Sequence, residues 1–211
     1  MNPLRTAIAL SFVVAATAAQ AAHAADFAAC FTLKPGVAYM IDDDKIRISR
    51  ERFGDREAIA MISSAGVPTT TYYDPSGRAL LGSVQYGIAG DANAPVVTER
   101  YAQTPEFPAT AKPGAKFKLQ GKGQRTLHGE GTVENLEYPG FDHFTFVGFE
   151  DLELPVDFKK RKFPGTCRLK AQEDGLVAEF WYAPGFGRVK FVRYQNGEAQ
   201  ITLQLDSILS E

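Results

Sequence analysis

The sequence predicts an all-β protein, with one antiparallel sheet in a single domain behind an N-terminal signal peptide. No segment keeps apolar residues at the 3.6-residue spacing of an amphipathic helix. Short runs rich in aromatic and β-branched residues recur instead, separated by turn-forming Gly, Pro, Asn and Asp. Roughly ten strands of ordinary length would leave exposed edges in a flat sheet, so we expect the sheet to curl or close.

The N-terminus has the pattern of a cleaved secretory signal. Arg5 gives a short positive region, Ala7–Ala19 is an uncharged apolar run, and Ala22-His23-Ala24 places small residues where a signal peptidase cleaves. The apolar run is too short to cross about 30 Å of hydrocarbon as a helix. We therefore expect residues 1–25 to be removed, and residues 26–211 to form one β domain in the periplasm or outside the cell. An uncleaved anchor is the alternative.

The two cysteines, Cys30 and Cys167, are expected to form a disulfide, because export carries them to an oxidising compartment. In the loop-entropy description such a bridge stabilises the fold by up to about 4–5 kcal/mol. Two unrelated buried thiols are one alternative. Lipidation of Cys30 is another, since Phe27–Cys30 resembles a lipobox, although Asp26 separates it from the apolar run.

Charge and length exclude several classes of protein. The formal net charge of the chain is −2, which argues against a surface for nucleic acid or for an anionic membrane. No other apolar run approaches the length of a transmembrane helix, so we expect no stable membrane span. The remaining length suits one domain with a sizeable core.

In the first half of the chain, strands are expected between clear turn signals. Ile46 and Ile48 alternate with polar residues, as in a half-buried strand. Asp42-Asp43-Asp44 is a polar corner, Asp74-Pro75-Ser76-Gly77 favours a β-turn, and residues 87–95 have a loop composition. The expected strands are residues 37–41, 46–53, 57–63, 67–73, 78–86 and 96–101.

The second half begins with an extended connection at residues 104–114, which contain three prolines. Residues 157–162 are expected to form a surface turn, while Glu173-Asp174-Gly175 and Asn196-Gly197 favour hairpin turns. The expected strands are residues 117–119, 124–136, 141–154, 163–171, 176–182, 188–194 and 199–208.

The corner at residues 178–192 is the clearest tertiary signal. Proline fixes φ near −65° and glycine tolerates positive φ, so Ala183–Gly187 is expected to be a tight turn between two strands. The only tryptophan lies beside it and is expected at the centre of the core. The structural residues of this corner are Trp181, Tyr182, Pro184, Gly185 and Gly187.

Several short motifs resemble the TapB-like family of exported bacterial β proteins, which is close to a domain family of unknown function. The motifs are FTLKPG (31–36), FGDREA (53–58), YYDPSGRALLG (72–82), TFVGFEDLELP (145–155), FPGTCRL (163–169) and FWYAPGFGRVKF (180–191), the most specific. Tyr39 stands where the family often has Trp, and Val156-Asp157-Phe158 replaces its usual Ala-Gly-Thr. The resemblance implies a single strongly curved sheet, a half-barrel or open barrel, in the cell envelope, and it implies no activity.

No set of residues has the spacing of a catalytic or metal site. His128 and His143 lack neighbouring ligands at zinc spacing, and the Asp42–Asp44 run lacks the spacing of an EF-hand. Glu150 points to the opposite face of a strand from Asp151 and Glu153. A GxSxG nucleophile motif is also missing. We therefore expect a non-catalytic protein without a cofactor.

Two residue groups are candidates for binding. Lys159, Lys160, Arg161 and Lys162 could contact an anion, such as an acidic lipid head group, or form a solvated loop. The chain also has fifteen Phe and eight Tyr, more than one face of a flat sheet needs. These rings either fill the interior or leave a concave face for an apolar ligand. The candidate ligand face is Phe144, Phe146, Phe180 and Phe191.

Together these observations predict an exported cell-envelope protein whose concave sheet face binds an apolar small molecule or an envelope protein. A structural envelope component without a small ligand is the second hypothesis. A hydrolytic enzyme is the third hypothesis. We rank it last because no convergent set of titratable residues supports it.

Overall fold

The computed structural model describes residues 27–87, 94–173 and 175–211. A 3-10 helix, η2 (Ala28–Phe31), precedes fourteen strands, and no α-helix occurs among the described residues. The strands are β1 (Ala38–Ile41), β2 (Asp44–Phe53), β3 (Arg56–Ser63), β4 (Thr69–Tyr73), β5 (Leu80–Tyr86), β6 (Pro95–Gln103), β7 (Lys116–Lys118), β8 (Lys122–Leu127), β9 (Thr132–Glu137), β10 (His143–Val156), β11 (Lys159–Glu173), β12 (Leu176–Ala183), β13 (Gly187–Gln195) and β14 (Glu198–Ser210). The predicted all-β class is confirmed.

All fourteen strands belong to one antiparallel sheet that does not close. Its order is β7-β10-β11-β12-β13-β14-β1-β2-β3-β4-β5-β6-β8-β9, so the C-terminal strand pairs with the first strand and joins the two halves of the chain. Residues 124–136, expected as one bent strand, instead contain the β8–β9 hairpin, because Gly131 turns the chain with a φ of +64°.

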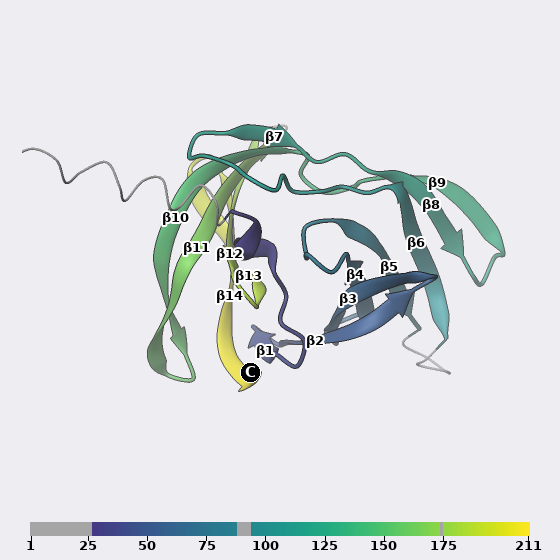
Figure 1. Ribbon diagram of the computed structural model, residues 1–211, viewed down its shortest axis with the longest axis horizontal. Helices are drawn as coiled ribbons and strands as arrows, with labels where there is room; N and C mark the ends of the chain where they lie inside the picture. The colour runs from purple at the N-terminus through teal and green to yellow at the C-terminus, as the bar shows by residue number, and fades with distance from the viewer. Residues whose placement is uncertain (1–26, 88–93, 174) are drawn as a thin grey trace, which may run out of the picture.

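The sheet curls so that β10–β14 face β2–β6 across a concave interior (Figure 1). Residues 104–121, which we call the strap, leave β6, cross this interior to place β7 beside β10, and return to β8. Hydrogen bonds hold the strap to both halves: Leu80 N–H donates to the Pro105 carbonyl at 3.0 Å, and Gly114 N–H donates to the Phe146 carbonyl at 2.7 Å. The extended connection predicted for residues 104–114 is therefore the part that spans the opening of the sheet.

The turns with strong local chemistry form as predicted. Asn196 and Gly197 both have positive φ, 53° and 82°, as a type I′ hairpin turn requires. Gly77 N–H donates to the Asp74 carbonyl at 2.9 Å. In the corner between β12 and β13, Phe186 N–H donates to the Ala183 carbonyl at 3.1 Å. The expected signal peptide, residues 88–93 and Asp174 lie outside the described residues.

The β10–β11 hairpin departs from the prediction. Its turn is only Asp157-Phe158, both at positive φ, and Lys159–Lys162 begin strand β11 rather than forming a surface turn. Nothing in the sequence marks a left-handed Phe158, so the predicted turn at residues 157–162 is longer than the turn in the structure. Register shifts between Phe146 and Gly148 and between Glu150 and Leu152 bend the hairpin. Its tip then contacts β14, where Asp157 N–H donates to the Asp206 carbonyl at 2.8 Å.

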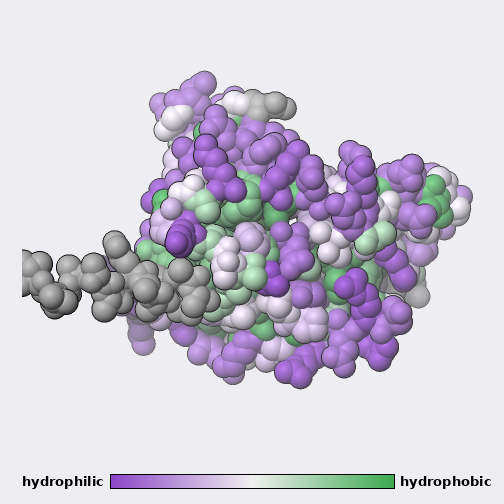
Figure 2. Space-filling view, turned by 45° about the horizontal axis from the view of Figure 1, so that its top comes forward, coloured by the Kyte–Doolittle hydropathy of each residue, from purple (hydrophilic) through white to green (hydrophobic). Residues whose placement is uncertain are grey.

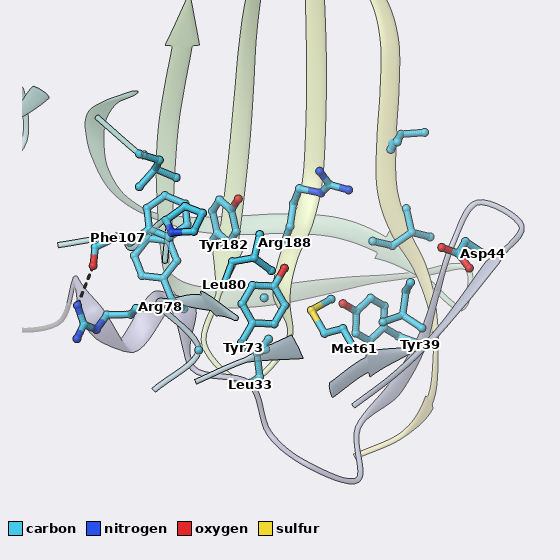
Figure 3. A pocket seen from close by; sticks show the side chains of 18 of the residues that line it. Leu33, Tyr39, Asp44, Met61, Tyr73, Arg78, Leu80, Phe107, Tyr182 and Arg188 are labelled. Atoms are coloured by element: carbon cyan, nitrogen blue, oxygen red, sulfur yellow. Dashed lines mark hydrogen bonds between the residues drawn. The ribbon is translucent and has the colours of Figure 1, made fainter. Parts of the chain in front are cut away.

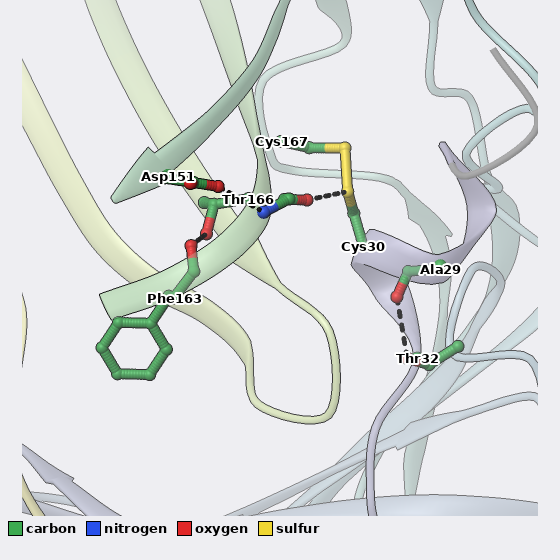
Figure 4. Close-up of a disulfide and its surroundings, with 8 residues drawn as sticks. Ala29, Cys30, Thr32, Asp151, Phe163, Thr166 and Cys167 are labelled. Carbon is green, nitrogen blue, oxygen red and sulfur yellow. Dashed lines mark hydrogen bonds between the residues drawn. A yellow bond between two sulfur atoms is a disulfide. The ribbon is translucent and has the colours of Figure 1, made fainter. Parts of the chain in front are cut away.

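Aromatic side chains from η2, the strap, β10 and β12 pack together in the interior. Phe31 stacks on Phe107 of the strap with ring centroids 4.1 Å apart, and Phe117 stacks on Phe144. The predicted disulfide between Cys30 and Cys167 fixes η2 to β11 beside these rings (Figure 4). We call this group the ring cluster; its members are Phe27, Phe31, Phe107, Phe117, Phe144, Phe146, Phe180 and Tyr182.

A second cluster lies where the bent hairpin meets the middle of the sheet. Leu154 and Phe163 of the hairpin join Trp181, Val189 and Leu205 in one buried group. Trp181 is 5% exposed and belongs to this buried group. The β12–β13 corner beside it is also attached to the segment after η2, because Gly185 and residues 32–34 exchange two backbone hydrogen bonds of 2.9 Å.

Candidate functional site

The concave interior contains a cavity of about 450 Å³ below the strap. Its walls come from both halves of the sheet, from the segment after η2 and from the strap (Figure 3). On the face drawn in the space-filling view, hydrophobic residues gather in the middle and hydrophilic residues surround them (Figure 2). The apolar residues that line the cavity include Phe31, Leu33, Ile41, Ile46, Met61, Leu80, Phe107, Leu119 and Leu203.

Two glycines allow the backbone to approach closely at the base of the cavity. A Cβ at Gly77 would lie 2.0 Å from the Phe31 carbonyl oxygen, and one at Gly187 would lie 2.8 Å from Leu33 Cδ2. Both glycines have positive φ, 77° and 78°. The β4–β5 turn and the β12–β13 corner can therefore both pack against residues 31–33, which brings the two halves of the sheet to one cavity.

Four tyrosines also line the cavity: Tyr39, Tyr73, Tyr138 and Tyr182. The Tyr39 hydroxyl donates to the Phe186 carbonyl at 2.8 Å, which joins β1 to the corner. Burial raises the pKa of Tyr39, Tyr73 and Tyr182 above the ordinary value, and Arg188 opposes this rise in each. Burial likewise raises the pKa of Tyr138 to about 12. These phenols therefore stay neutral at physiological pH.

The raised pKa values predict a loss of stability in alkali. Burial holds the pKa of Tyr101 and Tyr138 at about 12, against 10.0 for an ordinary tyrosine. A pKa raised in the folded state favours folding below the unfolded pKa, and this contribution disappears as the pH rises from about 10 to about 12. Absorbance at 295 nm should show tyrosines that ionise late and together with the loss of the β-sheet circular dichroism. Ionisation of all eight tyrosines near pH 10 in the folded protein would contradict this.

Among the charged residues that line the cavity, Arg78 and Asp44 have protein partners. Arg78 forms an ion pair with Glu106 at 2.9 Å and donates to the Phe107 carbonyl at 2.7 Å. Asp44 accepts hydrogen bonds from the Ser63 hydroxyl and from the backbone N–H groups of residues 64 and 65. The polar corner predicted at residues 42–44 thus holds the β3–β4 connection through one of its three carboxylates.

Arg188 differs from these residues. It lines the cavity directly opposite Tyr182 in the β12–β13 register, and no hydrogen bond or ion pair joins it to another of the described residues. Its guanidinium carbon lies 5.5 Å from the centre of the Phe191 ring. The cavity therefore combines an apolar wall, tyrosine hydroxyls and one cation that is not neutralised by a salt bridge.

The candidate ligand face of Phe144, Phe146, Phe180 and Phe191 stays a prediction. The first three are buried, and none of the four lines the 450 Å³ cavity. Phe180 stacks on Tyr182 with ring centroids 6.4 Å apart, so it packs behind a residue that does line the cavity. Phe144, Phe146 and Phe180 thus pack behind the cavity wall as members of the ring cluster, and Phe191 packs against that cluster.

The basic cluster is partly neutralised. Lys160 pairs with Glu153 at 3.0 Å, and Arg161 pairs with Glu211. The Arg161 guanidinium also lies over the Phe163 ring, 5.7 Å from its centre. Lys159 and Lys162 have no ion pair with the described residues. The anion contact proposed for this cluster stays a prediction.

The acidic and histidine side chains considered for chemistry have structural partners. Glu150 accepts from the Trp181 indole N–H at 2.6 Å, and Asp151 accepts from Gly165 N–H at 3.2 Å. His143 pairs with Asp142 at the surface, and His128 bonds the Thr98 hydroxyl at 2.8 Å. Within residues 27–87, 94–173 and 175–211, no three His, Cys, Asp or Glu side chains come together as metal ligands.

Sequence reasoning missed Tyr73, Tyr138 and Arg188 as residues of one site. The pairing of Tyr182 with Arg188 could have been read from the predicted turn at Ala183–Gly187, because residues flanking a hairpin turn face each other. Tyr73 and Tyr138 come from distant strands and carry no local signal.

The described part of the chain contains no helix with the length and apolar character of a membrane span. Comparisons of the chain with protein-family models, with curated proteins and with solved structures found no match in any of the three.

Proposed function

We propose that the protein is a non-catalytic binding module of the cell envelope that holds an apolar small molecule in the concave cavity. One observation carries the proposal: a space of about 450 Å³, lined mostly by apolar side chains, under the strap. Ligand sites in proteins are typically clefts of about 300–1,000 Å³ with apolar walls and a few polar groups. The disulfide suits an oxidising compartment such as the periplasm.

The aromatic residues support this proposal in a different way from the one expected. If the rings only filled the interior, as a structural envelope component would allow, they would leave no open space inside the sheet. Instead Phe31, Phe107 and Tyr182 of the ring cluster line the cavity together with aliphatic residues such as Leu33, Ile46 and Leu203. The signal peptide and the likeness to the TapB-like family remain predictions.

The cavity predicts a clear result for one pair of variants on β14. Leu203 lines the cavity, whereas the neighbouring Thr202 is exposed and points to the other face of the strand. Leu203→Trp should fill the cavity and weaken binding of the neutral dye N-phenyl-1-naphthylamine by about tenfold or more, equivalent to about 1.4 kcal/mol. Thr202→Trp should bind the dye as the unchanged protein does. The measurement is dye fluorescence as protein is added.

Two further results decide between the proposal and the structural alternative. Circular dichroism and thermal unfolding must show that both variants fold, and Leu80→Trp tests the opposite wall of the cavity. Solvent extraction of the purified protein, followed by mass spectrometry, should recover an apolar compound. Dye binding that is absent, or equal in Leu203→Trp and Thr202→Trp, together with extracts that contain no such compound, would favour a structural component.

A further inference from the structure

Arg188 is an exposed residue that lines the cavity, and it offers a ligand a charged group that the apolar wall does not. It follows the corner glycine Gly187, and its register partner across the hairpin is Tyr182. A guanidinium is always charged at physiological pH and offers five N–H donors in a planar fork. None of these donors has a hydrogen-bond or ion-pair partner among the described residues, whereas Arg78, the other cation of the cavity, is paired with Glu106.

Tyrosine hydroxyls lie near this cation. In the close-up view the Tyr73 and Tyr182 hydroxyls and the Arg188 guanidinium lie on the same side of the cavity (Figure 3). The hydroxyls of Tyr73 and Tyr182 have no hydrogen-bond partner among the described residues, yet they are not sealed from solvent. The effect of Arg188 on the pKa of each of these two tyrosines agrees with their proximity. The two tyrosine hydroxyls and the Arg188 guanidinium can thus donate hydrogen bonds to one ligand in the cavity.

The charges around the cavity limit the kind of anion that fits. One unpaired cation matches one negative charge. The carboxylates of Asp42, Asp43 and Asp44 lie at the β1–β2 turn on the same cavity, and they would repel a group with two negative charges more strongly than a group with one. A carboxylate carries one charge and accepts two parallel hydrogen bonds from a guanidinium fork. A phosphate monoester carries more charge than this site neutralises.

We propose that the cavity binds a monocarboxylic acid with an apolar tail, with its carboxylate paired to Arg188 and hydrogen-bonded by the hydroxyls of Tyr73 and Tyr182. The tail lies along the aliphatic wall that includes Met61 and Leu203. This assignment rests on the proposed function, because it requires the cavity to hold an apolar ligand, and it adds the chemical class of that ligand and the residues that select it.

Isothermal titration of the purified protein with dodecanoate, dodecanol and dodecyl phosphate tests the head group at a constant tail. We expect dodecanoate to bind about 10- to 100-fold more tightly than dodecanol, which is the effect of a charge-assisted hydrogen-bonded pair. Arg188→Gln should remove this difference and leave dodecanol binding unchanged. Tyr73→Phe and Tyr182→Phe should each weaken dodecanoate binding by about 2- to 10-fold.

The matched control is Arg47→Gln on β2, which removes one exposed positive charge next to Ile46 and does not line the cavity. It should bind all three compounds as the unchanged protein does. Arg188→Lys keeps the charge without the fork, and we expect dodecanoate binding intermediate between the unchanged protein and Arg188→Gln. The comparison of the three compounds on the unchanged protein needs no variant to fold.

The outcomes separate this assignment from the proposed function. Equal binding of dodecanoate and dodecanol would overturn the role of Arg188 and leave the apolar cavity in place. Tighter binding of dodecyl phosphate than of dodecanoate would overturn the choice of a carboxylate. Failure of all three compounds to bind would overturn the proposed function together with the assignment.

Discussion

Replacing Cys30 and Cys167 together by alanine is expected to lower the free energy of unfolding by about 4–5 kcal/mol. The two residues are 137 positions apart, so their bond closes most of the described chain into one loop. Without the bond, the unfolded chain gains the entropy that this loop removes. Most domains are stable by only about 5–15 kcal/mol, so a loss of this size is a large share of the total.

The measurement is urea unfolding followed by the fluorescence of Trp181, the only tryptophan of the chain. Reduced protein with both cysteines intact is the matched control, because it lacks the bond and keeps both sulfur atoms. The reduced protein and the double alanine variant should unfold at similar urea concentrations, well below the oxidised protein. A difference of less than about 1 kcal/mol between the oxidised and reduced proteins would show that the loop contributes little.

The bond also has a local consequence. Cys30 belongs to η2, and both Phe31 of η2 and the preceding Phe27 pack into the ring cluster. The residues after η2 form the base of the cavity, where Leu33 pairs with Gly185 of the β12–β13 corner in an isolated β-bridge. Reduction should therefore weaken dye binding in the cavity before it unfolds the whole protein, because residues 27–33 lose their covalent attachment to β11.

Local chemistry made much of the fold predictable. Asn196-Gly197 and Asp74–Gly77 specify their turns through residues that tolerate the required backbone angles, and the pairing of the flanking strands follows from the turns. The prediction of residues 157–162 as one broad turn was wrong because it relied on local preferences alone. A left-handed Phe158 is unfavourable by itself, and it is held by the pairing of β10 with β11 rather than by its own preference.

Long-range placement was not predictable from these signals. The three-residue strand β7 joins the edge beside β10, far from its sequence neighbours β6 and β8, and no local pattern marks that crossing. The cavity depends on it, because the strap carries Phe107 and Leu119 over the interior. The candidate site could be anticipated only as far as one hairpin reaches, which is the pair of Tyr182 and Arg188.

Trp181→Ala is expected to lower the free energy of unfolding by about 3–5 kcal/mol, the usual range for removing a large buried aromatic side chain. The indole is 5% exposed and packs with residues of the bent β10–β11 hairpin and of β13. Its loss would leave a void between the hairpin and the sheet. Because the variant has no tryptophan, urea unfolding of both proteins should be followed by circular dichroism.

Trp181→Phe separates packing from polar contacts at the same position. The indole N–H donates to Glu150, and the Arg168 and Lys190 cations lie 5.3 Å and 4.9 Å from the ring centre. Phenylalanine keeps most of the packing and the ring face but removes the donor. The Glu150 side chain is 38% exposed, so water can replace the lost bond, and the variant should be less stable by only about 1 kcal/mol. A loss equal to that of Trp181→Ala would mean that the bond to Glu150, rather than burial of the ring, holds the hairpin against the sheet.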